Sequence, residues 1–210
     1  MKSNKLIFDI GFNNGNFTQD FFRHYPDSRS IGVDGNLFWI NHFNNNPIKN
    51  VELLNYVVSD KDNEKIEFFM CDVNRDINSI NPEWIDRIRH KHFYDISKKS
   101  IYINSITLDN MIYKYGLPDF IKLDIEGAEY LALKGLSHKV NVINLEWSEE
   151  YFENTLKCVD LLLKLGYNKF GNTEQSDKLQ NIEYKTWDEL GLYLNIDPTR
   201  KQRWGTLYAM

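Results

Sequence analysis

The sequence lacks the features of a membrane protein and of a disulfide-rich secreted protein. No apolar run approaches the roughly 20 residues that span a bilayer, and the first residues lead into an expected strand without a secretory pattern. The two cysteines, Cys71 and Cys158, lie in different expected elements and form neither a disulfide framework nor a metal-ligand spacing. We therefore expect a reducing, cytoplasmic location and no membrane contact.

The chain also lacks an excess of positive charge. The chain has 25 Lys and Arg against 30 Asp and Glu, a net charge of −5, and its densest basic cluster, at 87–92, is short and typical of a solvated helix face. We therefore expect no nucleic-acid partner. The length of 210 residues and the hydrophobic content of 42 % suit one globular α/β domain with a sizeable core, over residues 1–210.

The most informative stretch is 6–18, L-I-F-D-I-G-F-N-N-G-N-F-T. Its apolar run predicts a buried strand, a turn with Gly11 and Gly15 follows, and Phe17 and Phe21 at helical spacing predict a helix. Strand, glycine turn and helix open many nucleotide-binding domains, because glycine lets the backbone approach a ligand and the helix N-terminus offers free N–H groups. An ordinary strand-to-helix turn without a ligand is the alternative.

The middle of this turn differs from a dinucleotide-binding turn. Asn13 stands where the pattern G-x-G-x-x-G has the glycine that lets the backbone meet a pyrophosphate. Asp9 precedes the first glycine by two residues, and a carboxylate here would repel a pyrophosphate but attract the ammonium of an amino-acid moiety. The pattern favours S-adenosylmethionine (SAM) over NAD as the cofactor.

Polar residues also follow the next two expected strands. Asp34 ends the strand expected at 30–33, where nucleotide-binding folds place the acid that binds ribose hydroxyls; a helix N-cap is its alternative role. Ser59 and Asp60 follow the strand expected at 51–58 and are candidates for a contact with adenine, with a simple polar turn as the alternative.

A second group of acids follows the strand expected at 118–123. The sequence D-I-E-G-A-E places Asp124, Glu126 and Glu129 within six residues, at the sheet edge where ligands bind. Repulsion between their charges makes such a cluster costly unless the acids are used. Glu129 has an alternative role in stabilising the start of the next helix. Glu146 ends the following expected strand.

The remaining pattern alternates between strands and helices. Further strands are expected at 65–70, 100–106, 140–146, 167–170 and 204–209, and helices at 108–115, 130–134, 149–165 and 187–194. About seven core strands alternating with helices predict an α/β fold with a doubly wound, Rossmann-like sheet. Its last strand is expected to be antiparallel, because no crossover helix precedes it. Residues 72–99 predict a variable insertion, either a substrate-facing loop or a surface excursion.

Together these segments resemble the FkbM family of SAM-dependent methyltransferases. The matching motifs are D-I-G-F-N-N-G-N-F-T (9–18), V-V-S-D (57–60), I-T-L-D (106–109), P-D-F-I-K-L-D-I-E-G-A-E (118–129), L-K-G (133–135) and I-N-L-E (143–146). The resemblance implies a seven-stranded sheet with an antiparallel last strand. It also implies three sets of cofactor contacts. Asp34 would bind the ribose, and Ser59 or Asp60 would lie near the adenine. The methionine side of SAM would be lined by Asp9, Gly11, Asn13 and Gly15.

The resemblance further implies methyl transfer to a hydroxyl group of a sugar, glycan or secondary metabolite. The candidate catalytic carboxylates are Asp124 and Glu126, with Glu146 behind them, and Lys122 is expected to be an ion-pair partner. A divalent ion on Asp124 and Glu126 is an alternative that we favour less. Phe12 departs from the family, which usually has a small residue there. A catalytically inactive protein that serves as a scaffold is the alternative function, and an NAD-dependent enzyme ranks third.

Overall fold

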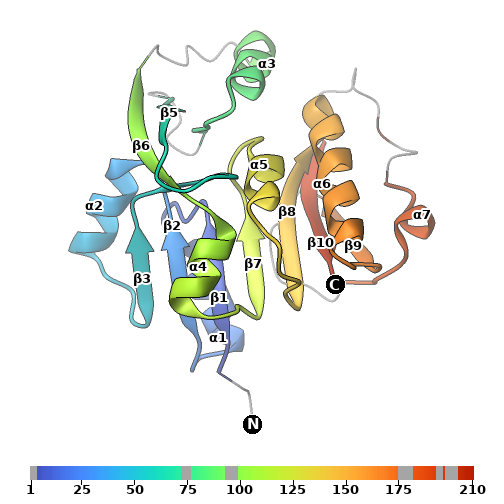
Figure 1. Cartoon of the computed structure of the whole chain (residues 1–210), viewed down its shortest axis with the longest axis horizontal. Helices are drawn as coiled ribbons and strands as arrows, with labels where there is room; N and C mark the ends of the chain where they lie inside the picture. Colours follow the sequence, from blue (N-terminus) through green and yellow to red (C-terminus); the bar gives the residue numbers. More distant parts are fainter. Residues whose placement is uncertain (1–3, 72–76, 93–98, 175–181, 193–195, 197–202) are drawn as a thin grey trace.

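The computed structural model describes residues 4–71, 77–92, 99–174, 182–192, 196 and 203–210, without the side chains of 88–92. Seven strands form the central sheet in the order β3-β2-β1-β7-β8-β10-β9, and three form a smaller sheet in the order β4-β6-β5 (Figure 1). The strands are β1 (Leu6–Ile10), β2 (Arg29–Val33), β3 (Val51–Leu54), β4 (Val57–Val58), β5 (Lys65–Phe69), β6 (Ser100–Ile106), β7 (Phe120–Leu123), β8 (Val142–Ser148), β9 (Phe170–Glu174) and β10 (Trp204–Ala209).

The central sheet is doubly wound. Strands β3, β2, β1, β7 and β8 pair in parallel, whereas β10 runs antiparallel to both β8 and β9. The predicted seven-stranded, Rossmann-like sheet with an antiparallel last strand is therefore confirmed. The strand order reverses between β1 and β7, and their carboxyl ends form the crevice in which such sheets bind ligands.

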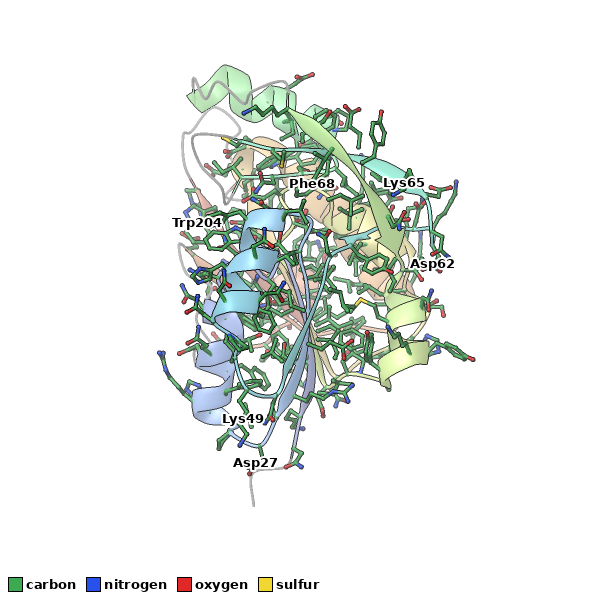
Figure 2. All side chains as sticks on the ribbon, turned by 90° about the vertical axis from the view of Figure 1, so that its left-hand side faces the viewer. Asp27, Lys49, Asp62, Lys65, Phe68 and Trp204 are labelled. Carbon is green, nitrogen blue, oxygen red and sulfur yellow. The ribbon has the colours of Figure 1, made fainter. Side chains whose placement is uncertain are left out.

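Helices cover both faces of this sheet. The helices of the described residues are α1 (Asn16–His24), α2 (Leu37–Asn45), α3 (Pro82–His92), α4 (Leu108–Tyr115), α5 (Glu129–Lys134), η1 (Glu149–Tyr151), α6 (Phe152–Lys164) and α7 (Trp187–Leu190). Helices α1 and α2 lie on one face and α4 on the other (Figure 2). The main core forms where α4, α5 and α6 pack on the sheet, and a smaller cluster around Phe17 and Phe21 fills the space beneath α1.

Local sequence signals set several of these boundaries. The side chain of Thr107 accepts the N–H of Asn110 at 3.0 Å and so caps the start of α4. Gly116 follows the end of α4 with φ 97°, a conformation that favours glycine. Pro82 is the first residue of α3, where its missing N–H costs no helical hydrogen bond. These three signals correctly predicted where both helices begin and where α4 ends.

The single strand predicted over 51–58 is wrong. The chain leaves the central sheet after β3, and β4 instead joins β6 in the smaller sheet. The break lies at Asn55, whose amide nitrogen donates to the carbonyl oxygens of Asp34 at 3.0 Å and Gly35 at 3.2 Å. These contacts tie the segment between the two strands to the end of β2. The smaller sheet therefore lies above the carboxyl ends of the central strands, beside α3 (Figure 1).

Three boundaries near the C-terminus also differ from the prediction. Strand β8 extends to Ser148, and β9 begins at Phe170, because both pair along the length of β10. Tyr167, expected in a strand, instead packs in the core, where its hydroxyl bonds to the backbone of Val140. Helix α7 ends at Leu190, before Gly191 with φ 60°. In the described part of the chain, no helix combines the length and apolar character of a membrane span.

Candidate functional site

A cavity of about 270 Å³ opens at the carboxyl ends of β1, β2 and β7. Three turns that follow these strands form much of its wall, at 11–14, 33–35 and 124–126. Residues of the smaller sheet and residues 78–80 also line it. Phe68, from β5, lies near the top of the central sheet in Figure 2. The cavity thus occupies the place at which a doubly wound sheet binds its ligand.

Asp34 stands on the wall of this cavity with its carboxylate fixed by two backbone N–H groups. The N–H of Asn13 donates to Oδ2 and that of Asn36 to Oδ1, each at 2.7 Å. Burial raises the pKa of Asp34 to about 6, although these two hydrogen bonds oppose the shift. The N-cap of α2 is Asn36, which accepts the N–H of Phe38 at 2.9 Å, so Asp34 does not take that alternative role. Each carboxylate oxygen keeps a lone pair for a hydroxyl donor.

The turn after β1 packs closely against the turn after β7. Gly11 has φ 80°, and a Cβ there would lie 1.8 Å from the carbonyl oxygen of Asp124. Glycine is therefore required at this position for both conformation and space. Gly11 and Asn13 line the cavity, and the contact with SAM expected of them remains a prediction.

Gly15 has a packing role instead and is not among the residues that line the cavity. A Cβ there would lie 2.6 Å from the ring of Phe12, and a Cβ at Gly32 in β2 would lie 2.5 Å from the same ring. The ring of Phe12 also packs edge-on against Phe43, with 5.7 Å between centroids. Two glycines thus make room for the aromatic side chain of Phe12.

Asp9 is buried below the cavity and not on its wall, where the prediction had put it. Its Oδ2 accepts the hydroxyl of Thr18 at 2.7 Å, and its Oδ1 lies 3.3 Å from Lys122 Nζ. The same Nζ donates to the carbonyl oxygen of Gly11 at 2.9 Å and lies 3.3 Å from Asp124 Oδ2. Lys122 is thus the ion-pair partner that was expected, and it ties the β1 turn to the β7 turn.

The charge of Lys122 is maintained by its neighbours. Burial alone would lower its pKa, but the carboxylates of Asp124 and Asp9 outweigh burial and hold the pKa of Lys122 above its ordinary value. Lys122 therefore carries a positive charge at neutral pH. The cation of Lys122 thus lies beside the part of the cavity wall that Asp124 forms.

The predicted catalytic acids come together at this edge of the sheet. Asp124, Glu126 and Glu146 each have one oxygen within 4.8 Å of the others. Asp124 and Glu126 line the cavity, whereas Glu146 borders a smaller hollow of about 20 Å³ behind them. Burial, followed by the charges of Asp124 and Glu126, raises the pKa of Glu146 well above its ordinary value. Glu146 therefore keeps its proton to a higher pH than an exposed glutamate does. Divalent cations such as Mg²⁺ and Ca²⁺ are also bound by clusters of carboxylate oxygens.

Ser59 and Asp60 are not brought to the cavity. The hydroxyl of Ser59 is directed to Asp60 Oδ1 at 3.3 Å, and the Asp60 carboxylate forms an ion pair with Lys134. The adenine contact predicted for them remains a prediction. Residues of the smaller sheet and its approach line the cavity instead: Tyr56, Val57, Val58 and Phe68. Phe68 was missed because the small sheet was not predicted.

The described part of the predicted insertion packs on the acidic turn. Ser79 donates its hydroxyl to the carbonyl oxygen of Glu126 at 2.6 Å, and Asn81 donates its amide to that of Gly127 at 2.7 Å. The ring of Trp84 fills the space that a side chain at Gly127 would take, 2.6 Å from a Cβ built there. This support for the site was missed, because no local pattern links segments more than 40 residues apart. Residues 72–76 and 93–98 of the insertion lie outside the described residues.

Comparisons with known proteins give one family. The model of the methyltransferase FkbM domain matches residues 9–171, more than half of the chain. No curated protein sequence gave a match. A structure of precorrin-6y C5,15-methyltransferase from Geobacter metallireducens is 11 % identical and has a TM-score of 0.50, with 100 % of this chain and 81 % of that chain covered. A SAM-dependent methyltransferase from Aquifex aeolicus has 11 % identity and a TM-score of 0.44, covering 100 % and 83 %. At such low identity the first likeness shows the fold alone.

Proposed function

Because this chain belongs to the FkbM family of SAM-dependent methyltransferases, we propose that it transfers the methyl group of SAM to a hydroxyl group of a sugar, glycan or secondary metabolite. One observation carries the proposal. The carboxylate of Asp34 and the carboxylates of Asp124 and Glu126 line the same cavity at the switch point of the sheet. Asp34 suits the hydroxyls of a nucleoside ribose, whereas Asp124 and Glu126 suit a hydroxyl group that accepts the methyl group and loses its proton.

The polar and apolar groups on the wall fit the parts of SAM. The free lone pairs of Asp34 suit the two ribose hydroxyls, and Asp124 offers a negative charge to the cationic methionine end. The apolar side chains of Val58 and Phe68 suit a flat base. When bound, SAM supplies a methyl group that is already activated by its positively charged sulfur.

The residues of the chain would orient the acceptor and remove its proton. The acceptor oxygen would take the methyl group as the methyl–sulfur bond breaks, with the electron pair of that bond staying on sulfur, and the hydroxyl proton would pass to a carboxylate oxygen of Asp124 or Glu126. Holding the reacting atoms in line contributes about 7–11 kcal/mol, and a positioned base contributes about 10²–10⁴-fold. Glu146 supports this step by its position, because one of its carboxylate oxygens lies within 4.8 Å of those of Asp124 and Glu126. A divalent ion on Asp124 and Glu126 is the less favoured alternative.

The proposal includes a cytoplasmic location, a small-molecule or glycan acceptor and no nucleic-acid or membrane partner. The net charge of −5 supports the absence of a nucleic-acid partner. Cys71 and Cys158 pack in separate clusters and are not joined by a disulfide, as expected of a protein from a reducing compartment.

A transfer assay tests the proposal. The protein is incubated with SAM and panels of sugars, glycans and hydroxylated metabolites, and products are identified by mass spectrometry. We expect a hydroxyl to gain one methyl group, with S-adenosylhomocysteine (SAH) formed in equal amount. Asp124→Asn should slow the transfer about 10²–10⁴-fold, whereas Asp20→Asn on α1, which pairs with Arg23 on the surface, should not. A methyl group found only on nitrogen or carbon would refute the hydroxyl assignment, and SAM binding without transfer would favour the scaffold.

A further inference from the structure

Glu129 is the acid of the D-I-E-G-A-E sequence that does not reach the cavity. It is the first residue of α5, yet its exposure is only 2 %. Its Oε1 accepts the backbone N–H of Ile125 at 3.1 Å and that of Gly127 at 3.3 Å. Both amides belong to the turn whose acids face the cavity. Glu129 therefore does more than stabilise the start of a helix.

This turn has a conformation that requires support. Glu126 has φ 57° and Gly127 has φ 83°. The left-handed conformation is unfavourable for a glutamate, and it persists where surrounding contacts fix it. Ser79 and Asn81 hold the carbonyl oxygens of Glu126 and Gly127 from one side. Glu129 holds the amides from the other side, so the turn is fixed by partners on both sides.

A second buried side chain fixes Glu129 itself. Asn154 on α6 donates its amide to Glu129 Oε2 at 3.1 Å, and its exposure is 6 %. The two residues link α5 to α6, and both oxygens of Glu129 thereby have partners. Neither residue lines the cavity. Their contacts instead lead to the backbone that carries Asp124 and Glu126.

We propose that Glu129 and Asn154 form a positioning pair that holds the 124–127 turn in the conformation in which Asp124 and Glu126 face the acceptor. The pair touches neither cofactor nor acceptor and acts through two backbone amides. The link to catalysis rests on the proposed function, whereas the link to the shape of the turn does not. Glu129 is thus a positioning residue, and its carboxylate is used for its acceptor oxygens and not for proton transfer.

The chemistry of glutamine separates these two uses. In Glu129→Gln the Oε1 atom can still accept both N–H groups. The new amide nitrogen can donate to the side-chain oxygen of Asn154 if the Asn154 amide rotates by 180° and exchanges its oxygen and nitrogen. In Glu129→Ala both amides lose their acceptor. A residue that transfers protons would fail in both variants, so rescue by glutamine is specific to positioning. Glu153→Ala on α6 is the control, because that exposed glutamate pairs with Arg87 at the surface.

Hydrogen exchange in the ligand-free protein measures the turn directly. We expect the amides of Ile125 and Gly127 to exchange about 10-fold to 100-fold faster in Glu129→Ala. In Glu129→Gln and in the control they should remain within about threefold of the parent protein. With the acceptor found by the transfer assay, kcat should fall about 100-fold in Glu129→Ala, since misplacing catalytic groups by 1 Å has an effect of that size, and Glu129→Gln should retain most of it.

Two results would overturn the proposal. The first is unchanged exchange at both amides in Glu129→Ala. The second is a Glu129→Gln variant that keeps both amides protected but loses activity. If Glu129→Ala does not fold, Asn154→Ala takes its place, and unchanged exchange there counts against the pair in the same way. A parent protein that binds no SAH would refute the proposed function alone, because the exchange data would still decide whether the pair holds the turn.

Discussion

Removing the charge of Lys122 should destabilise the protein strongly, because Lys122 is the cation of a buried network. In Lys122→Met the side chain keeps its length and apolar stem but loses its contacts with Asp9, Asp124 and the carbonyl oxygen of Gly11. Asp9 is 0 % exposed and Lys122 is 6 % exposed, so water cannot replace the lost partner of Asp9.

The magnitude follows from this burial. Breaking a buried ion pair by removing one partner costs about 3–5 kcal/mol, because the other charge is left uncompensated. Domains of this kind have a total free energy of unfolding of about 5–15 kcal/mol. We therefore expect Lys122→Met to lower the free energy of unfolding by about 3–5 kcal/mol, measured as a shift of the urea midpoint at an unchanged slope.

A second substitution tests the cause. Asp9→Asn removes the buried charge that Lys122 compensates, so the double variant Asp9→Asn with Lys122→Met should recover a large part of the loss. The folded-state pKa of Lys122 is raised, so its contribution is complete below pH 10 and is lost only at higher pH. A loss below about 1 kcal/mol, typical of an exposed pair, or a double variant less stable than the single one, would refute the reasoning.

Further outcomes are expected at the site. The affinity for SAH should fall as pH drops through about 6 in the parent protein, because Asp34, whose pKa is about 6, has fewer acceptor lone pairs for the ribose once it is protonated. Calorimetry should show a weaker pH dependence of the affinity in Asp34→Asn. An equal pH dependence in the two proteins would contradict the role of Asp34. Gly11→Ala should abolish SAH binding, because its Cβ would lie 1.8 Å from the carbonyl oxygen of Asp124. Gly116→Ala is the control, since Gly116 also has a positive φ but the nearest atom to a Cβ there lies at 3.9 Å. This control should bind SAH normally and lose only about 1–3 kcal/mol of stability. Treatment with EDTA should leave methyl transfer unchanged, and a loss that Mg²⁺ restores would instead favour a cation on the acidic cluster.

The central sheet was predictable from the sequence because its strands are short apolar runs separated by strong local signals. Glycine turns, an N-capping threonine at 107 and a proline at 82 each act within a few residues. The smaller sheet was not predictable in the same way. Its separation from β3 depends on Asn55, whose side chain contacts carbonyl oxygens 20 and 21 residues earlier. Likewise, the ends of β8 and β9 are set by pairing with β10, far along the chain.

The site follows the same division between local and distant causes. The positions of Asp34, Asp124 and Glu126 on the cavity wall follow from the ends of parallel strands, which meet at one edge of a sheet. The burial of Asp9 could not be inferred, because it depends on Lys122, 113 positions later on a neighbouring strand. The supports of the acidic turn from Ser79 and Asn154 come from segments without any motif.

Calorimetric titration of SAM and SAH into the purified protein tests the central claim most directly, with NAD and an Asp34→Ala variant measured beside it. We predict micromolar binding of SAM and SAH, loss of that binding in Asp34→Ala, and no binding of NAD. A well-folded protein that binds neither SAM nor SAH, or that binds NAD in the same cavity, would contradict the claim that this cavity is the cofactor site of a methyltransferase.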